Sequence, residues 1–332
     1  MNNTPRSRWF GPRRPFHPFG RGLFMLLATL LLDLPVPALA APGDLDPSFD
    51  GDGRVLTDFR SGRFSGFDSV NALVVHPNGK LVVAGSRTVL VPFGLVRLAV
   101  PRFALARYNP DGSLDRSFGG DGRVSTRFGF SSGARALVLQ PDGKPVAAGV
   151  SGLGTAPEDF ALARYNPDGN LDTSFGTGGL VRTDFGGGEL AAALVLQPDG
   201  KLVAAGVNFF DEDIALARYN PDGNLDTSFG SGGLVRTDFG GSESVSALVL
   251  QPDGKLVAAG FGRVGRVGSF VLARYSPNGS IDTSFGAGGM ALTSSAAARP
   301  ARSPYPYRRT ASCWQRVVQM RVAMKISPWR VM

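Results

Sequence analysis

The sequence predicts an all-β fold of four-stranded antiparallel blades, most simply the blades of a β-propeller in a partial or open array. A block of about 55 residues recurs along the chain, and a period of this length indicates an array of one supersecondary unit. Each copy holds short apolar runs between Pro and Gly turn signals, without a helical pattern. The four intact copies carry a turn glycine at Gly79, Gly143, Gly200 and Gly254.

The third copy shows the expected elements in order. Residues 194–196 and 202–205 flank a Pro-Asp-Gly turn, in which Pro pre-sets φ and Gly accepts a positive φ, so they predict a β-hairpin. Residues 214–219 lead into a second such turn, and residues 225–229 are expected to complete a second hairpin. Residues 234–239 then continue or extend an outer strand before a glycine-rich link.

Radial packing would bury both faces of each small sheet against its neighbours. Small residues such as those at 204–206 fit this packing, because they let inner strands approach a crowded axis. A β-solenoid is the competing fold, but its coils are usually shorter than this period and lack two tight turns in each repeat.

Two strings carry a family resemblance: Gln-Pro-Asp-Gly-Lys-Leu-Val-Ala-Ala-Gly, and Phe-Ala-Leu-Ala-Arg-Tyr-Asn-Pro-Asp-Gly-Asn-Leu-Asp-Thr-Ser-Phe-Gly. They resemble the delta-60 repeat family of bacterial secreted propeller-like proteins, from Leu45 to about Thr293. More distantly, the paired turns are similar to the blades of NHL-type propellers. The resemblance implies a β-propeller and an extracytoplasmic setting, and it brings no established catalytic residues.

The chain divides into a leader, a repeat body and a tail. Residues 1–40 have a basic start, an apolar core and a small-x-small end, which predict a signal peptide cleaved before Ala41. The apolar run is too short to span a membrane stably, and a retained anchor is the alternative. The repeats fill residues 41–293, with units at about 45–113, 114–170, 171–224 and 225–280 and a partial unit at 281–293.

The tail, residues 294–332, breaks the pattern and holds the only Cys of the chain, Cys313. In a shifted reading frame, its codons can encode the Pro-Asp-Gly-Lys and Phe-Ala-Leu-Ala-Arg-Tyr strings at the spacing of the repeat. We therefore expect that a frameshift near codon 294 scrambled a fifth blade and left an aberrant, disordered tail. A genuine unrelated tail is the alternative.

The net charge of the whole chain differs in sign from the net charge of the repeat body. The formal net charge is +8, but the leader holds five Arg and one Asp, and the tail holds eight Lys or Arg and no acid. Of the 35 basic and 27 acidic residues, the body keeps 22 and 26, a net charge of −4. Nucleic-acid binding is therefore not expected. The body also lacks Cys, so its stability must come from packing between blades.

The sequence does not predict an enzyme, and it offers no catalytic residue. The one His of the body, His76, occupies a turn position where the other copies carry Gln, and the body has neither a Cys nucleophile nor a His cluster. Carboxylate-only catalysis, as in a glycoside hydrolase, is the remaining alternative. Asp211 and Asp213, which lie outside the repeated pattern, are the candidates for it.

No cofactor is expected, although calcium is an alternative. The loop with Asn109, Asp111 and Asp115 alternates oxygen ligands around a Gly, loosely like part of an EF-hand loop, and Asp50 and Asp52 form a second weak candidate. Asn and Asp are also ordinary turn residues, since their side chains bond nearby backbone N–H groups. Turn chemistry is the favoured interpretation.

Each unit also repeats an Arg followed eight residues later by an Asp. A cross-hairpin ion pair in each blade would explain this repetition structurally. The residues are Arg107, Arg164, Arg218 and Arg274 with Asp115, Asp172, Asp226 and Asp282.

The units differ most in the link after the second strand, at residues 87–101, 151–158, 208–213 and 261–268. Function tends to reside on such variable loops of a rigid scaffold. We therefore expect an exported, non-catalytic scaffold that presents these loops to a protein, glycan or surface partner, without a membrane span after signal removal. A calcium-dependent adhesion or structural module is the alternative, and a truncated product without function is another.

Overall fold

The computed structural model describes residues 43–294, apart from 60–66, 95, 155–156 and 265–266. The chain forms two compact units, residues 1–47 and 48–332. In the first unit, the described residues 43–47 form a turn and a bend. The predicted signal peptide and nearly all of the predicted frameshifted tail lie outside the described residues. In the described part of the chain, no helix has the length and apolar character to cross a membrane.

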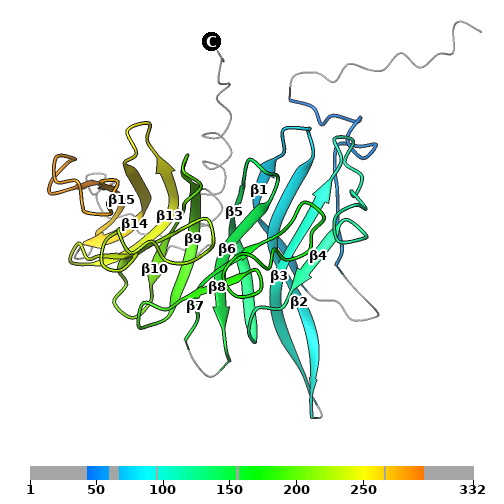
Figure 1. Ribbon diagram of the computed structural model, residues 1–332, viewed down its shortest axis with the longest axis horizontal. Helices are drawn as coiled ribbons and strands as arrows, with labels where there is room; N and C mark the ends of the chain where they lie inside the picture. Colours follow the sequence, from blue (N-terminus) through cyan, green and yellow to red (C-terminus); the bar gives the residue numbers. More distant parts are fainter. Residues whose placement is uncertain (1–42, 60–66, 95, 155–156, 265–266, 295–332) are drawn as a thin grey trace, which may run out of the picture. The chain divides into compact units, whose positions relative to one another are not determined.

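The second unit contains four sheets of four strands each (Figure 1). The first sheet consists of β1 (Asp68–Val75), β2 (Leu81–Phe93), β3 (Val96–Tyr108) and β4 (Arg123–Thr126). The second consists of β5 (Ser131–Leu139), β6 (Pro145–Gly152), β7 (Asp159–Arg164) and β8 (Leu180–Thr183). The third consists of β9 (Glu189–Leu196), β10 (Leu202–Asn208), β11 (Ile214–Tyr219) and β12 (Leu234–Thr237). The fourth consists of β13 (Ser242–Leu250), β14 (Leu256–Val264), β15 (Val267–Tyr275) and β16 (Met290–Ser294).

Within every sheet the strands pair antiparallel in chain order, and the described residues contain no helix. The predicted all-β fold of four-stranded propeller blades is therefore confirmed. The sheets begin later along the repeat than the units drawn from sequence. Residues 281–293, drawn there as a partial fifth unit, lead into and form most of β16, the last strand of the fourth sheet. Sequence similarity fixes the period of a repeat but leaves its starting point arbitrary.

The second turn of each unit differs from the expected hairpin. In the third sheet, Leu225 makes only an isolated bridge to Tyr219, and the strand that pairs with β11 is β12. The reason is a further turn in which the N–H of Gly233 donates to the carbonyl of Phe229 at 2.8 Å and returns the chain to the sheet. The outer strand is therefore the run that begins at Leu234.

Glycine is required at two places in each unit. Gly200 has φ +84° in the first turn, where its N–H donates to the carbonyl of Gln197 at 3.0 Å. Gly206 lies at a β-bulge, and a Cβ there would come 1.7 Å from the backbone oxygen of Leu190. The glycine of the repeated Ala-Ala-Gly string thus permits close approach of two neighbouring strands in the same sheet.

The apolar cores lie between neighbouring sheets. One cluster joins Phe160 and Leu162 of the second sheet to Leu202 and Tyr219 of the third. Equivalent clusters join the first sheet to the second and the third to the fourth. Packing between blades therefore buries the apolar side chains, as expected for a body without disulfides.

Hydrogen bonds repeat the contact between units. Tyr219 Oη donates to Thr183 Oγ1 of the preceding unit at 2.8 Å, and the N–H of Gly176 donates to the carbonyl of Asp222 of the next at 2.7 Å. The first sheet has the same contacts with residues 48–59, where Tyr108 Oη donates to Thr57 Oγ1 at 2.7 Å. Residues 48–59 thus take the place that the end of a preceding unit takes elsewhere.

Each sheet has two chemically different ends. The turn end carries the Pro-x-Gly turns between its first and second strands and the loop between its third and fourth strands. The link end carries the connection between the second and third strands and the connection to the next sheet. The described link-end residues are 87–94, 96–102, 127–133, 151–154, 157–159, 184–189, 208–213, 238–243, 261–264 and 267–270.

Candidate functional site

The turn end of every sheet holds one ion pair, which is buried in the second and third sheets and part-buried in the first and fourth. The Arg at the end of the third strand lies with Nε 2.7 or 2.8 Å from Oδ2 of the Asp eight residues later. The pairs are Arg107–Asp115, Arg164–Asp172, Arg218–Asp226 and Arg274–Asp282.

Asp226 shows how this carboxylate is compensated, by two ion pairs to Oδ2 and a side-chain hydrogen bond to Oδ1. Lys201 Nζ lies 3.0 Å from Oδ2, and the Ser228 hydroxyl donates to Oδ1 at 2.7 Å. Burial raises the pKa of Asp226, but Ser228, Lys201 and Arg218 outweigh burial and hold it well below its usual range. Arg218 also lies 4.5 Å above the ring of Phe229. The repeated Arg and Asp are therefore engaged in holding the turn end together.

The loop proposed for calcium belongs to this same network. Asp115 is paired with Lys80 and Arg107, each at 2.7 Å. Asp111 Oδ1 accepts from the N–H of Ser113 at 2.9 Å, and Asn109 Nδ2 donates to Ser113 Oγ at 3.0 Å. These are the bonds of turn chemistry.

The second weak calcium candidate lies against the same loop. The N–H of Asp50 donates to the carbonyl of Asp111 at 2.7 Å, and Asp50 has a positive φ of 51°. Asp52 Oδ1 accepts from the N–H of Arg54 at 2.9 Å. The structure therefore brings Asp50 close to the first candidate loop through the backbone, while Asp52 caps its own turn.

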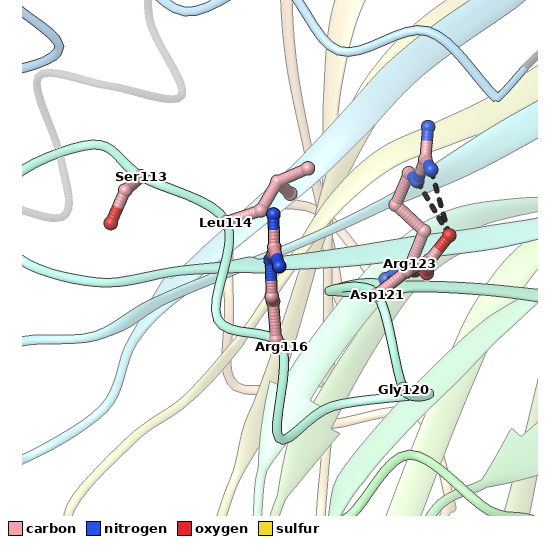
Figure 2. A pocket seen from close by; sticks show the side chains of 6 residues that line it. All are labelled: Ser113, Leu114, Arg116, Gly120, Asp121 and Arg123. Atoms are coloured by element: carbon pink, nitrogen blue, oxygen red, sulfur yellow. Dashed lines mark hydrogen bonds and ion pairs between the residues drawn. The ribbon is translucent and has the colours of Figure 1, made fainter.

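A hollow of about 370 Å³ opens beside this loop (Figure 2). Its lining residues are Ser113, Leu114, Arg116, Gly120, Asp121 and Arg123. The single carboxylate among them, Asp121, lies 2.7 Å from Nη2 of Arg123, as the dashed lines in Figure 2 show. The hollow therefore offers no uncompensated acidic group.

The link end, by contrast, contains acidic side chains that lie close to one another. Two clusters of three carboxylates lie there, and in each cluster one oxygen of every member lies within 4.8 Å of the others. We call them the first cluster, Asp159, Asp184 and Glu189, and the second cluster, Asp213, Asp238 and Glu243. The first two members of each come from one sheet and its outgoing connection, and the Glu belongs to the first strand of the next sheet.

In the first cluster, Glu189 is fully buried and accepts a hydrogen bond from Asn208 Nδ2 at 2.8 Å. Asp159 Oδ2 lies 3.5 Å from Arg182 Nε. Burial raises the pKa of Glu189 to about 7, and the carboxylates of Asp184 and Asp159 add to the shift. The cluster is thus partly compensated by one amide and one guanidinium.

In the second cluster, Glu243 is 2% exposed, and neither of its carboxylate oxygens has a hydrogen-bond partner among the described residues. Burial raises the pKa of Glu243, and Asp238, Asp213 and Glu212 raise it further. The backbone N–H of Phe239 lowers this pKa, although it does not form a hydrogen bond of normal geometry with the Glu243 carboxylate. Arg236, the counterpart of Arg182, pairs instead with Asp211.

The corresponding positions between the first and second sheets are not acidic. Arg102 and Arg127 stand there, next to the paired Phe103 and Thr126. Ser132 pairs with Ser151 at the position where Glu189 pairs with Asn208. The backbone of the junction therefore forms without any of the three carboxylates. Among the residues that the structure describes, the acidic clusters occur at two of the three junctions between sheets.

Sequence reasoning missed these clusters because it treated repeated Asp residues as structural. A signal was present: the string Thr-Asp-Phe-Gly recurs with its Asp at 184 and 238, and a Glu follows five residues later both times. The view of Asp213 as outside the repeat is corrected. Asp159 pairs with Ser151 across its hairpin, and the carbonyl of Asp213 likewise accepts from the N–H of Asn208, so the two Asp residues are equivalent.

Exposed aromatic side chains also gather at the link end. Phe209 and Phe210 are 52% and 69% exposed, and the N–H of Phe210 donates to Asn208 Oδ1 at 2.9 Å. Asn208 is the residue that bonds Glu189, so this aromatic pair adjoins the first cluster. Phe130, Phe261 and Phe270 are further exposed aromatic residues of link-end segments.

The fold and its repeated contacts are those of a propeller-repeat protein, and comparison with known families agrees. A family model described as "Domain of unknown function (DUF5122) beta-propeller" matches residues 76–118, 140–175, 197–229 and 251–285. A second model, "WD domain, G-beta repeat", matches residues 60–89. The chain therefore carries propeller repeats. No curated protein gave a significant match to the chain.

Several solved structures are similar in fold. A GH43 β-1,3-galactosidase bound to galactodeoxynojirimycin is 11% identical with a TM-score of 0.35, covering 64% of this chain and 74% of its own. A GH43 protein from Bacillus licheniformis is 15% identical with a TM-score of 0.37, covering 67% and 44%. The hydrazine synthase of Kuenenia stuttgartiensis is 13% identical with a TM-score of 0.36, covering 70% and 33%.

The prediction that the chain is not an enzyme is contradicted by this comparison, because the similar structures include a GH43 galactosidase. The prediction rested on the absence of His and Cys, which says nothing against chemistry performed by carboxylates alone. At these identities and TM-scores the likeness transfers no activity or substrate to this chain.

Proposed function

We propose that this chain is an exported scaffold of delta-60 type that binds a glycan at the link end of its blades. The observation that carries the proposal is the placement of the exposed Phe209 and Phe210 beside the carboxylates of the first cluster. Aromatic faces stack on the apolar faces of sugar rings, and carboxylates accept hydrogen bonds from hydroxyl groups.

The contrast between the two ends of each blade supports this assignment. At the turn end, the repeated Asp side chains are bonded to Arg, Lys and Ser of the same unit. At the link end, the connections vary in length and sequence, and the hairpin of β2 and β3 extends past the other strands of its sheet (Figure 1). A varied edge on a repeated scaffold is where binding specificity is usually placed.

Export is part of the proposal. The basic and apolar leader over residues 1–40 supports it, as does the resemblance of the repeats to a family of secreted proteins. The frameshift near codon 294 stays a prediction, and resequencing the gene through the end of the coding region tests it.

The test is binding of the purified full chain to a panel of immobilised glycans. We expect retention of at least one glycan, with roughly tenfold weaker binding in Phe210→Ser. Val249→Ser is the matched control, because Val249 is 54% exposed but lies at the turn end of β13. Retention of no glycan, or equal losses in both variants, would overturn the proposal. Measuring released reducing ends in the same reactions decides whether a bound glycan is also cleaved.

A further inference from the structure

The second cluster places three acidic side chains around one point. Asp213 precedes β11 and Asp238 follows β12, so these two side chains flank strands of the third sheet. Glu243 lies in β13, the first strand of the fourth sheet. Their facing oxygens lie within 4.8 Å of one another. That spacing suits a common centre about 2.4 Å from each oxygen, the usual distance from calcium to an oxygen ligand.

The burial of Glu243 is a second and independent observation. Its side chain is 2% exposed, and both of its oxygens lack a hydrogen-bond partner among the described residues. A buried carboxylate without a partner is costly, and proteins avoid this cost by pairing the charge or coordinating a metal. The side chain faces Asp213 and Asp238, which add negative charge instead of relieving it.

The fold itself does not demand these carboxylates. The junction between the first and second sheets has Arg102, Arg127 and Ser132 at the same register positions. The first cluster retains three carboxylates but has Arg182 and Asn208 against them. The second cluster therefore concentrates the most uncompensated negative charge of the three junctions between sheets.

We propose that Asp213, Asp238 and Glu243 form a binding site for a divalent cation, and that the cation is Ca²⁺. The ligand set contains only carboxylate oxygens, which suit a hard cation and disfavour copper or zinc. Carboxylates that bind through one or both oxygens meet the six to eight contacts of calcium together with water. Magnesium demands a stricter octahedral geometry, so we expect it to bind more weakly than calcium at this site.

A cation at this point would join the third sheet to the fourth, since Glu243 belongs to a different sheet from Asp213 and Asp238. Binding to the folded state alone stabilises it by mass action. The inference does not depend on the proposed glycan binding, because that proposal rests on Phe209, Phe210 and the first cluster, whereas the cation site rests on the second cluster.

The experiment titrates the full chain, first stripped with EGTA, with CaCl₂ and separately with MgCl₂ in a calorimeter. We expect saturable calcium binding, at least tenfold weaker magnesium binding and a thermal midpoint that rises by several degrees with calcium. In Asp238→Asn and Glu243→Gln, the calcium affinity of one site should fall at least tenfold, because an amide oxygen is neutral and affinity depends on the charge of the ligands.

Asp238→Asn keeps the fold intact, because an Asn oxygen can still accept the hydrogen bond that Gly240 N–H donates to Asp238 Oδ1 at 2.6 Å. It therefore tests the site independently of any change in stability that Glu243→Gln brings. Asp253→Asn is the matched control, since Asp253 is an exposed acid at the turn end of the fourth sheet.

Calcium affinity that stays unchanged in Asp238→Asn overturns the site, as does the absence of calcium binding to the native chain. Magnesium binding as tight as calcium binding overturns the identity of the ion. An equal fall in calcium affinity in Asp253→Asn would show general electrostatic attraction and would also overturn the site.

Discussion

Buried carboxylates at the turn end and at the link end of the same blades differ in their partners and in the direction of their pKa shifts. Asp226 at the turn end is 6% exposed, and Lys201 and Arg218 lie 3.0 and 2.8 Å from its Oδ2. Glu243 at the link end is 2% exposed and has no hydrogen-bond partner among the described residues. The pKa of Asp226 is lowered, because its partners outweigh burial, whereas burial raises the pKa of Glu243.

The difference separates stabilising carboxylates from carboxylates free to bind a ligand. Asp226 has equivalents with an Arg partner in all four units, so its role is the same in each. Glu243 has an acidic equivalent in Glu189 but Ser132 at the first junction, so its charge is not part of the common fold. Repetition alone therefore does not show whether an acidic residue is structural.

Removing the partner at the turn end should have the largest effect. Arg218→Met breaks the ion pair with Asp226 and the hydrogen bond from Nη1 to the carbonyl of Pro277. We expect a loss of about 3 kcal/mol in the free energy of unfolding, at the low end for a broken buried pair because Lys201 still partners Asp226. Urea denaturation measures it, and a loss under about 1 kcal/mol would show that the pair is solvent-screened.

Removing the charge at the link end should act in the opposite direction. Glu243→Gln, in the presence of EGTA, is expected to raise the free energy of unfolding by about 1–2 kcal/mol, because a charged group without partners is no longer buried. Asp253→Asn should stay within about 0.5 kcal/mol. A loss of stability in the Gln variant would contradict the view that Glu243 is uncompensated.

The pH dependence should also distinguish the two ends. Glu189 has its pKa raised from 4.5 to about 7, so between these values the folded state binds more protons than the unfolded state. Stability without calcium should therefore fall as pH rises from about 5 to 7. Asp115, Asp172 and Asp226 have lowered pKa values, so their contribution is present above 3.8 and is lost as pH falls below it.

Chemical denaturation at several pH values in EGTA tests this expectation. Glu189→Gln should flatten the slope between about pH 5 and 7 while leaving the acid limb unchanged. A slope that persists in this variant would assign the titration to another group.

The smallest expected effect concerns the contact between units, which both ends share. Tyr219→Phe removes the hydrogen bond to Thr183 and should cost about 1 kcal/mol. Tyr275→Phe should cost less, because the bond to Thr237 is longer, at 3.0 Å, and Thr237 is only half-buried. Equal losses in thermal unfolding would indicate that the two junctions are energetically the same.

Much of the fold could be predicted because its signals are local. The turn around Gly200 follows from the Pro-Asp-Gly string at 198–200, and the short apolar runs on either side of it form β9 and β10. The outer strand was harder, because the bridge at Leu225 resembles a hairpin in sequence, and only the turn at Gly233 shows that β12 pairs with β11. Sequence similarity also could not say where one sheet ends and the next begins.

The candidate site could be predicted far less. Asp213, Asp238 and Glu243 are separated along the chain and come from two sheets, so their meeting depends on the register of each strand. The pairing of Arg236 with Asp211 also redirects a guanidinium whose counterpart in the first cluster lies near Asp159. No sequence pattern indicates the register that brings the three carboxylates together, and none indicates which Asp pairs with Arg236.

The sequence by itself determined the repeat, the all-β class and the turns, because backbone preferences and hydrophobic patterning act over a few residues. Only the tertiary structure decided which carboxylates are compensated. In the sequence, nothing distinguishes Asp226 from Glu243 as a compensated or an uncompensated carboxylate. Their electrostatic environments differ because electrostatic energy depends on distance in space and on burial.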